Sequence, residues 1–146
     1  MAPTWNAMSM SKPPAEMSGF IFICKGGEDM KKMIREGKFR MKANEIQKVK
    51  RIKKGMTIFL YDYSEMRFHG IWKSKTPGYK NEAKKYAATP AEIQVERQNE
   101  YNSLPIGYFK TILHYSHKCN NTRFYTELDG DQVQKMAEVF NKGIRV

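Results

Sequence analysis

The stretch KKGMTIFLYDYSEMRFHGIWK, residues 53–73, decides how this chain folds. Residues 57–61 are mostly β-branched or aromatic, a composition that favours a half-buried strand. The polar residues 62–65 interrupt this run, and a second aromatic-rich run follows at residues 66–72. Two such runs joined by a short polar segment predict an antiparallel hairpin.

The first strand of this hairpin is expected to lie in the middle of a sheet. Successive side chains in a strand point to opposite faces, so Phe59 and Tyr61 share one face and Ile58 and Leu60 share the other. Both faces are therefore apolar. Such a strand needs cover on both sides, which indicates neighbouring strands and packing layers supplied by the rest of the chain.

The second strand of the hairpin contains a glycine at its centre. The same alternation places Phe68, Gly70 and Trp72 on one face. Because Gly70 has no side chain, either another group approaches its backbone closely or the strand bends there. We expect these three residues to share a face in both cases.

Further elements flank the hairpin on its N-terminal side. The continuous apolar run at residues 20–24 predicts a strand that is buried on both faces. Glu28 and Asp29 place negative charge in the first turn of a helix that we expect to end at Gly37. A second, short helix is expected from Asn44.

The C-terminal side of the chain continues the pattern. Residues 91–97 alternate as a third main strand, and a helix is expected after Pro105. Residues 124–125 form a possible short strand, and Asp129 with Gln132 resembles a capping box that opens the last helix. This order of elements predicts an α+β domain, with helices packed around a small, strongly bent sheet or barrel.

Composition bounds the class of protein. The chain has 146 residues, of which 40% are hydrophobic, so one ordinary domain with a real core is expected. We place that domain at residues 18–146, after a flexible tail at residues 1–17 that contains several prolines and no apolar period. No run approaches the roughly 20 apolar residues that span a bilayer.

The compartment is expected to be intracellular, in the cytoplasm, the nucleus or both. The first 18 residues lack the apolar core of a secretory signal. The chain has two cysteines, Cys24 and Cys119, so no disulfide framework is indicated.

The charge of the chain favours a polyanionic partner. There are 26 Lys and Arg residues against 15 Asp and Glu residues, giving a net charge of +11 and a pI of about 9.7. Nucleic acid is a more natural partner than a membrane for such a chain, although the same lysines can simply solvate two amphipathic helices.

The basic residues are concentrated, and aromatic residues lie among them. Twelve of the 26 fall between Lys25 and Lys54, and a second group lies in the loop between Lys73 and Lys85. Single-stranded nucleic acid pairs its phosphates with cations and stacks its bases on aromatic rings. The residues that we predict to bind it are Lys31, Arg35, Lys38, Arg40, Lys50, Arg51, Lys54, Trp72 and Tyr79.

An ordered set of short motifs resembles the DCD domain, the Development and Cell Death module found mainly in plant proteins. The motifs occupy residues 19–24, 52–63, 69–74, 90–95, 104–109 and 127–140. The chain departs from the family pattern at residues 39–42, where Phe-Arg-Met-Lys replaces Phe-Gly-Leu-Pro, and at Glu92 and Ile106. The resemblance implies a fold like the small barrels of the PUA and YTH kind, several of which bind RNA. It implies no enzymatic activity and a link to stress signalling, development and programmed cell death.

Two functions from different classes follow. The first is a non-enzymatic module that binds RNA or single-stranded nucleic acid. The second is a protein-interaction module in stress, development or cell-death signalling, whose charge serves solubility or an acidic partner. We expect no cofactor and no metal, because His114, His117 and Cys119 match no common zinc spacing even with Cys24 as a fourth ligand.

Overall fold

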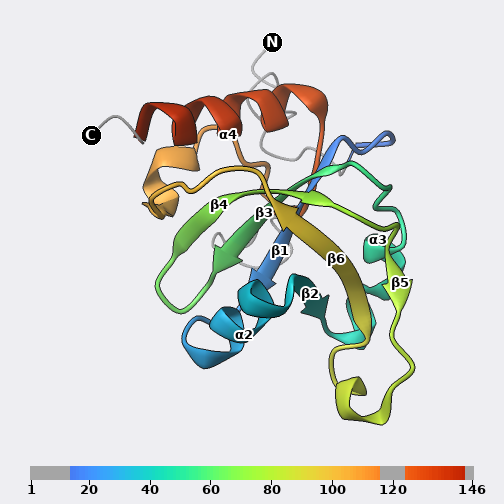
Figure 1. The fold of residues 1–146 in the computed structure, drawn as a ribbon. Helices are drawn as coiled ribbons and strands as arrows, with labels where there is room; N and C mark the ends of the chain where they lie inside the picture. Colours follow the sequence, from blue (N-terminus) through green and yellow to red (C-terminus); the bar gives the residue numbers. More distant parts are fainter. Residues whose placement is uncertain (1–13, 116–123, 144–146) are drawn as a thin grey trace.

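An eight-stranded, strongly curled sheet forms the body of the molecule. The computed structural model describes residues 14–115 and 124–143. The sheet order is β2-β6-β4-β3-β1-β8, with β5 paired to β6 and β7 paired to β4 (Figure 1). The strands are β1 (Gly19–Cys24), β2 (Lys38–Met41), β3 (Thr57–Asp62), β4 (Arg67–Ser74), β5 (Tyr79–Lys80), β6 (Ala91–Arg97), β7 (Leu104–Pro105) and β8 (Glu127–Leu128).

The predicted hairpin and its central first strand are confirmed. β3 pairs antiparallel with β4 on one side and parallel with β1 on the other. Its residues Ile58, Phe59 and Leu60 have no exposed surface. The strands expected at residues 20–24 and 91–97 are also present, as β1 and β6.

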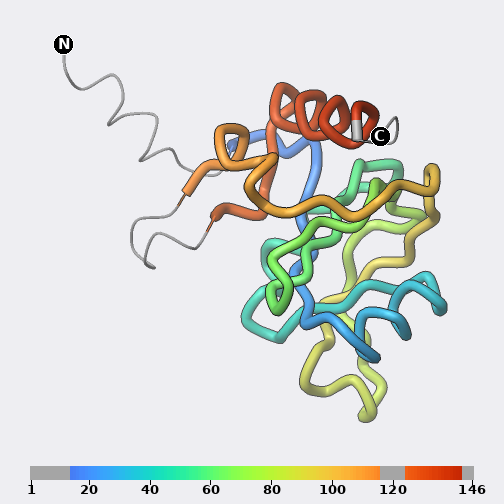
Figure 2. The backbone as a smooth tube through the Cα atoms, turned by 90° about the vertical axis from the view of Figure 1, so that its left-hand side faces the viewer, coloured from blue at the N-terminus to red at the C-terminus, as the bar shows by residue number. Residues whose placement is uncertain are grey.

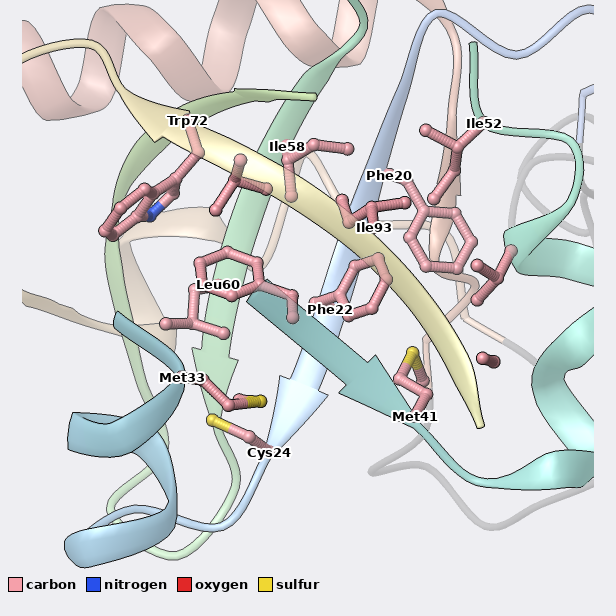
Figure 3. Packing of buried hydrophobic residues seen from close by; sticks show 14 of the residues in the cluster. Phe20, Phe22, Cys24, Met33, Met41, Ile52, Ile58, Leu60, Trp72 and Ile93 are labelled. Carbon is pink, nitrogen blue, oxygen red and sulfur yellow. The ribbon is translucent and has the colours of Figure 1, made fainter. Parts of the chain in front are cut away.

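Two hydrophobic clusters explain why β3 is apolar on both faces. The α2-side cluster contains Ile58 and Leu60 together with residues of β1, β2 and β6. Figure 3 shows its side chains gathered between β6 and the β1–β3 pair. The α4-side cluster contains Phe59 and Tyr61 from the opposite face of β3.

The two clusters are closed by different helices. α2 (Glu28–Glu36) contributes Met33 to the first cluster, and α4 (Gly130–Gly143) contributes Met136 and Phe140 to the second. Figure 2 shows α2 and α4 on opposite sides of the strands. The short α3 (Ile46–Val49) follows a single 3-10 turn and buries Val49. None of the helices in the described residues combines the length and apolar character needed to cross a membrane.

The helix ends follow from local chemistry, as predicted. Gly37 caps α2 in the left-handed conformation, with φ of 69°, and donates its N–H to the Ile34 carbonyl. At the start of α4, the Gln132 N–H donates to Asp129 Oδ1 over 2.8 Å. The Asp129 N–H donates in return to Gln132 Oε1 over 3.0 Å, which completes the capping box.

A β-bulge divides β4. The β3–β4 register shifts between Phe59 and Tyr61, so that His69 and Gly70 together oppose one residue of β3. Gly70 has a φ of 78°, a conformation that glycine adopts without steric cost. The glycine therefore supplies the bend that the sequence allowed at this position.

The bulge corrects one prediction about β4. Phe68 belongs to the α4-side cluster, whereas Trp72 belongs to the α2-side cluster. The expectation that Phe68, Gly70 and Trp72 share a face is therefore wrong. The inserted residue reverses the alternation between Phe68 and Trp72, which simple counting by two cannot anticipate.

Three further elements differ from expectation. β2 has no counterpart among the predicted strands; it pairs with β6, placing Phe39 opposite Ile93. The helix expected after Pro105 is wrong, because a 3-10 turn, Ile106–Phe109, stands in its place. Residues 124–125 do not form a strand; Phe124 makes an isolated bridge with Tyr115.

The hairpin turn is tied to the end of β1 by one buried carboxylate. Asp62 Oδ1 accepts hydrogen bonds from the Gly26 N–H (2.9 Å), the Ser64 N–H (2.8 Å) and the Ser64 hydroxyl (2.6 Å). Asp62 is 2% exposed. A Cβ on Gly26 would lie 2.1 Å from Asp62 Oδ2, so the close approach requires glycine there.

These hydrogen bonds predict a pH-dependent stability. Burial alone would raise the pKa of Asp62, but the bonds from Ser64, Glu65 and Gly26 outweigh it and lower that pKa. Its contribution is therefore complete above the unfolded pKa of about 3.9, and is lost as the pH falls through the lower folded value. Asp62→Asn should reduce the free energy of unfolding at pH 7 by about 1.5–3 kcal/mol.

Chemical denaturation between pH 7 and pH 2 measures this effect. The difference between wild type and Asp62→Asn should shrink as the pH falls below about 4. Glu65→Gln is the matched control, because Glu65 lies in the same turn but is exposed. A difference that stays constant with pH would show that the charge of Asp62 does not stabilise the turn.

Candidate functional site

The first candidate feature is a basic hollow at the end of the β4–β6 pair, which we call the lysine hollow. Its volume is about 470 Å³. Three lysines and a single carboxylate give it a net positive charge, which suits an anionic ligand. The lining residues are Lys54, Gly55, Lys73, Ser74, Lys75, Glu96 and Gln98.

The backbone beneath these lysines is fixed by hydrogen bonds. Gly55 turns the chain with φ of 88°, and its N–H donates to the Ser74 carbonyl over 2.7 Å. The Lys75 N–H donates to the Gln94 carbonyl, also over 2.7 Å. Cross-strand pairing places Lys73 opposite Glu96. The three ammonium groups therefore extend from a rigid base.

The second candidate feature, which we call the His69 hollow, has a volume of about 380 Å³. Trp72 and Lys73 are consecutive residues of β4, so the two hollows lie on opposite faces of the β4–β6 pair. The lining residues of the second hollow are Ile34, His69, Gly70, Trp72, Arg97, Asn99, Glu100, Tyr101 and Asn102.

The predicted binding residues are only partly brought together. Lys54 lines the lysine hollow. Lys50 is exposed just after α3, and Lys31 and Arg35 are exposed on α2. Lys38 is half-buried at the start of β2. Two of these five cations thus lie on α2, one lies on β2, and two lie in the loop between α3 and β3.

Arg40 is buried and neutralised within the protein. Its side chain is 7% exposed. Its Nε donates to Glu92 Oε1 over 3.0 Å and its Nη2 donates to Glu36 Oε1 over 2.6 Å. The Arg40 guanidinium also lies 4.0 Å from the centre of the Tyr86 ring. We therefore remove Arg40 from the set of expected phosphate ligands and assign it a structural role.

Tyr79 belongs to the same buried network. Its hydroxyl donates to Glu92 Oε2, and Asn81 Nδ2 donates to Glu92 Oε1 over 2.9 Å. Burial and the bond to Glu92 raise the pKa of Tyr79 to about 12. These contacts anchor the long loop between β4 and β6 through the Tyr79 hydroxyl, while the residue as a whole is half-buried.

Arg51 and Trp72 are also engaged within the fold. Arg51 Nη2 donates to the carbonyl of Pro14 over 2.8 Å, and Nη1 lies 3.4 Å from Glu127 Oε2. Trp72 is 4% exposed, and its ring packs edge-on against Phe39. One edge of Trp72 reaches the His69 hollow, but most of its surface is core.

Lys73 and Lys75 were missing from the predicted set, although the loop that begins at Lys73 was recognised as basic. The alternation of β4 gave the signal, because it turns Lys73 away from the buried Trp72. What the sequence did not show is the turn at Gly55, which brings Lys54 beside them.

The residues considered for metal binding give no site within the described part of the chain. His117 and Cys119 lie outside the described residues. Within residues 14–115 and 124–143, no three His, Cys, Asp or Glu side chains are grouped closely enough to hold a metal ion. Burial raises the pKa of the Cys24 thiol to about 12, so it is protonated at neutral pH.

The sequence matches a known family over most of its length. The model of the Development and cell death domain matches residues 18–140. The chain is 27% identical over 144 residues to the DCD domain-containing protein NRP-A of Glycine max, covering 88% of the chain and 38% of that protein. It is 25% identical over 146 residues to the B2 protein of Daucus carota, covering 89% and 69%. The chain thus spans about two fifths of the length of NRP-A.

The fold is similar to that of solved YTH domains, which confirms the predicted α+β architecture. The Mmi1 YTH domain superposes with a TM-score of 0.69 at 11% identity, covering 95% of this chain and 96% of that one. The YTH domain of Zygosaccharomyces rouxii MRB1, solved with N6-methyladenosine RNA, gives a TM-score of 0.64 at 12% identity, covering 89% and 88%.

The buried ion pair gives a testable coupling. Arg40→Met leaves Glu92 buried without its cation and should cost about 3–5 kcal/mol of unfolding free energy. The double variant Arg40→Met/Glu92→Gln should cost clearly less than the sum of the two single variants, because it removes the uncompensated charge. Chemical denaturation of the four proteins measures the coupling.

Lys48→Met provides the control for this cycle. It breaks the more exposed pair between Lys48 and Glu45, at 3.5 Å, and should cost no more than about 1 kcal/mol. Additive effects of the Arg40 and Glu92 substitutions would contradict the assignment of a coupled, structural pair.

Proposed function

The chain belongs to the Development and cell death domain family, and from this premise we propose that it is a non-enzymatic module that binds RNA or another single-stranded nucleic acid. The observation that carries the proposal is the lysine hollow, in which Lys54, Lys73 and Lys75 line one concave surface. We place this role in the cytoplasm or nucleus, within the developmental and cell-death processes named by the family description.

The hollow has the chemistry of a phosphate-binding surface. Ammonium groups attract phosphates at long range and release condensed counterions on contact. Its hydrogen-bonded backbone holds the lysine Cα positions fixed, so the ammonium groups lose less freedom when a strand binds. Lys50, four residues before Lys54 in the chain, is also exposed.

Proteins of similar fold also support the proposal of nucleic-acid binding. One YTH domain of this fold was solved as a complex with RNA, at a TM-score of 0.65 and 11% identity. Sequence identity that low supports a shared fold but not a shared ligand. The proposal that this chain binds nucleic acid therefore rests on its own lysines. The competing function is an interaction module for an acidic protein, and the measurements below separate the two.

The salt dependence of binding tests the proposal. Three phosphate contacts should give a log–log slope of affinity against salt of about −2 for a single strand, at about −0.7 per contact. Lys54→Glu/Lys75→Glu should weaken binding to all sequences alike and flatten the slope by about 1.4. Lys73 is left unchanged because a glutamate there would oppose Glu96 across the strands.

Fluorescence anisotropy with a labelled single-stranded RNA, at a series of salt concentrations, provides the measurement. Lys110→Glu/Lys142→Glu changes net charge by the same amount, using exposed lysines outside both hollows. Equal effects of the two double variants would show that RNA is attracted by the overall positive charge of the protein and not bound at the lysine hollow. Binding to a polyglutamate chain but to no oligonucleotide would favour the acidic-protein alternative.

A further inference from the structure

The His69 hollow contains a buried polar atom that the fold leaves unused. His69 Nε2 is the one buried side-chain nitrogen or oxygen in the described residues that has no hydrogen-bond partner. Buried polar atoms nearly always have a partner, and those without one call for an explanation. Burial lowers the pKa of His69, so the ring is neutral at physiological pH. A neutral ring offers one nitrogen as donor and the other as acceptor.

A flat cation lies at the same hollow. The Arg97 guanidinium lies over the Trp72 ring, 4.8 Å from the ring centre. The Arg97 side chain is 42% exposed, so part of it is accessible to a ligand. Planar rings stack on guanidinium groups held in this way.

The remaining walls are preorganised and mostly uncharged. Asn99 Nδ2 donates to the Tyr101 hydroxyl over 3.1 Å, and that hydroxyl donates to Asn141 of α4 over 3.2 Å. These bonds hold the loop after β6 in place. Gly70, at the bulge, lines the hollow with backbone alone.

This chemistry suits a planar, uncharged ring better than a phosphate. The Glu100 carboxylate lines the hollow, 3.5 Å from Arg97, and would repel a phosphate. A ring with hydrogen-bonding edges can instead stack on Arg97. Because His69 Nε2 has almost no accessible surface, the His69 side chain must turn toward the hollow to bond to such a ring. Nucleobases have both properties, and proteins recognise unpaired bases by stacking together with edge hydrogen bonds.

We propose that the His69 hollow is a nucleobase site, in which an unpaired base stacks on Arg97 and hydrogen-bonds to His69 Nε2. The site rests on the proposed function, since it reads one base of the strand whose phosphates lie along the lysine hollow. The two hollows share strands β4 and β6 but present opposite faces of them, so the strand passes around this end of the pair. Phosphate contacts supply affinity there, and the base site supplies sequence preference.

Two variants and a control test this site. Arg97→Lys keeps the positive charge but loses the flat stacking surface, and His69→Ala removes the hydrogen-bonding edge. Lys110→Ala is the control outside both hollows. Each protein is titrated with four single-stranded RNAs of equal length, each made of a single kind of base. Thermal unfolding of each variant is measured as a check that it is folded. In a second titration, the ring nitrogens of His69 are followed by NMR as each of the four uncharged nucleosides is added.

The expected result is a preference of wild type for one base and a shift of the His69 ring signal with the matching nucleoside. Arg97→Lys should weaken binding of the preferred RNA by about 5- to 100-fold, the worth of one stacked base, at an unchanged salt slope. His69→Ala should abolish the preference, and Lys110→Ala should preserve it.

The outcomes separate this site from the proposed function. If wild type binds RNA but both variants retain its affinity and base preference, the nucleobase site is overturned while the lysine hollow stands. If no RNA binds but a nucleoside shifts the His69 signal, the proposed function fails and the ring site survives. If neither is observed, both are overturned.

Discussion

The structure depends on one constraint: β4 must contribute large side chains to the hydrophobic clusters on both faces of the sheet. Phe68 packs into the α4-side cluster and Trp72 into the α2-side cluster, although an unbroken strand would place them on one face. The β-bulge at His69 and Gly70 resolves the conflict by inserting one residue between them. The same insertion places His69 and a bare backbone beside an open hollow, so the requirement of the core also creates the candidate base site.

Charge in this protein divides into a structural part and a surface part. Arg40 and Arg51 are held by carboxylates and carbonyls within the fold; Arg40 is buried, whereas Arg51 keeps 37% of its side chain exposed. Burying the Arg40–Glu92 pair removes two charges from water, which is favourable only with further partners. Glu36, Tyr79 and Asn81 are those partners, and Tyr79 and Asn81 also fix the loop between β4 and β6 against the sheet. The surface lysines are left to define the proposed binding face.

The sequence predicted those elements whose signals are local. The hairpin, β1, β6, the stop of α2 at Gly37 and the capping box of α4 each follow from residues a few positions apart. β2 was not predicted because its lysine and arginine interrupt the apolar pattern that marks a buried strand. It forms a strand because it pairs with β6, which lies far away in the sequence. The role of Arg40 was missed for the same reason, since Glu92 lies 52 positions away. The sequence showed where basic residues are concentrated along the chain but could not show which cations converge, because that depends on the Gly55 turn and the β4–β6 register.

The pairing of β1 with β8 has a consequence for biosynthesis. Gly19 and Phe20, near the start of the described chain, pair with Leu128 and Glu127, close to its end. During translation β1 can pair with β3 early, but its other edge stays open until β8 and α4 have emerged from the ribosome. Contacts between such distant segments slow folding, and an unpaired edge beside apolar side chains favours aggregation. We therefore expect nascent chains of this domain to need protection on the ribosome until the last helix is released.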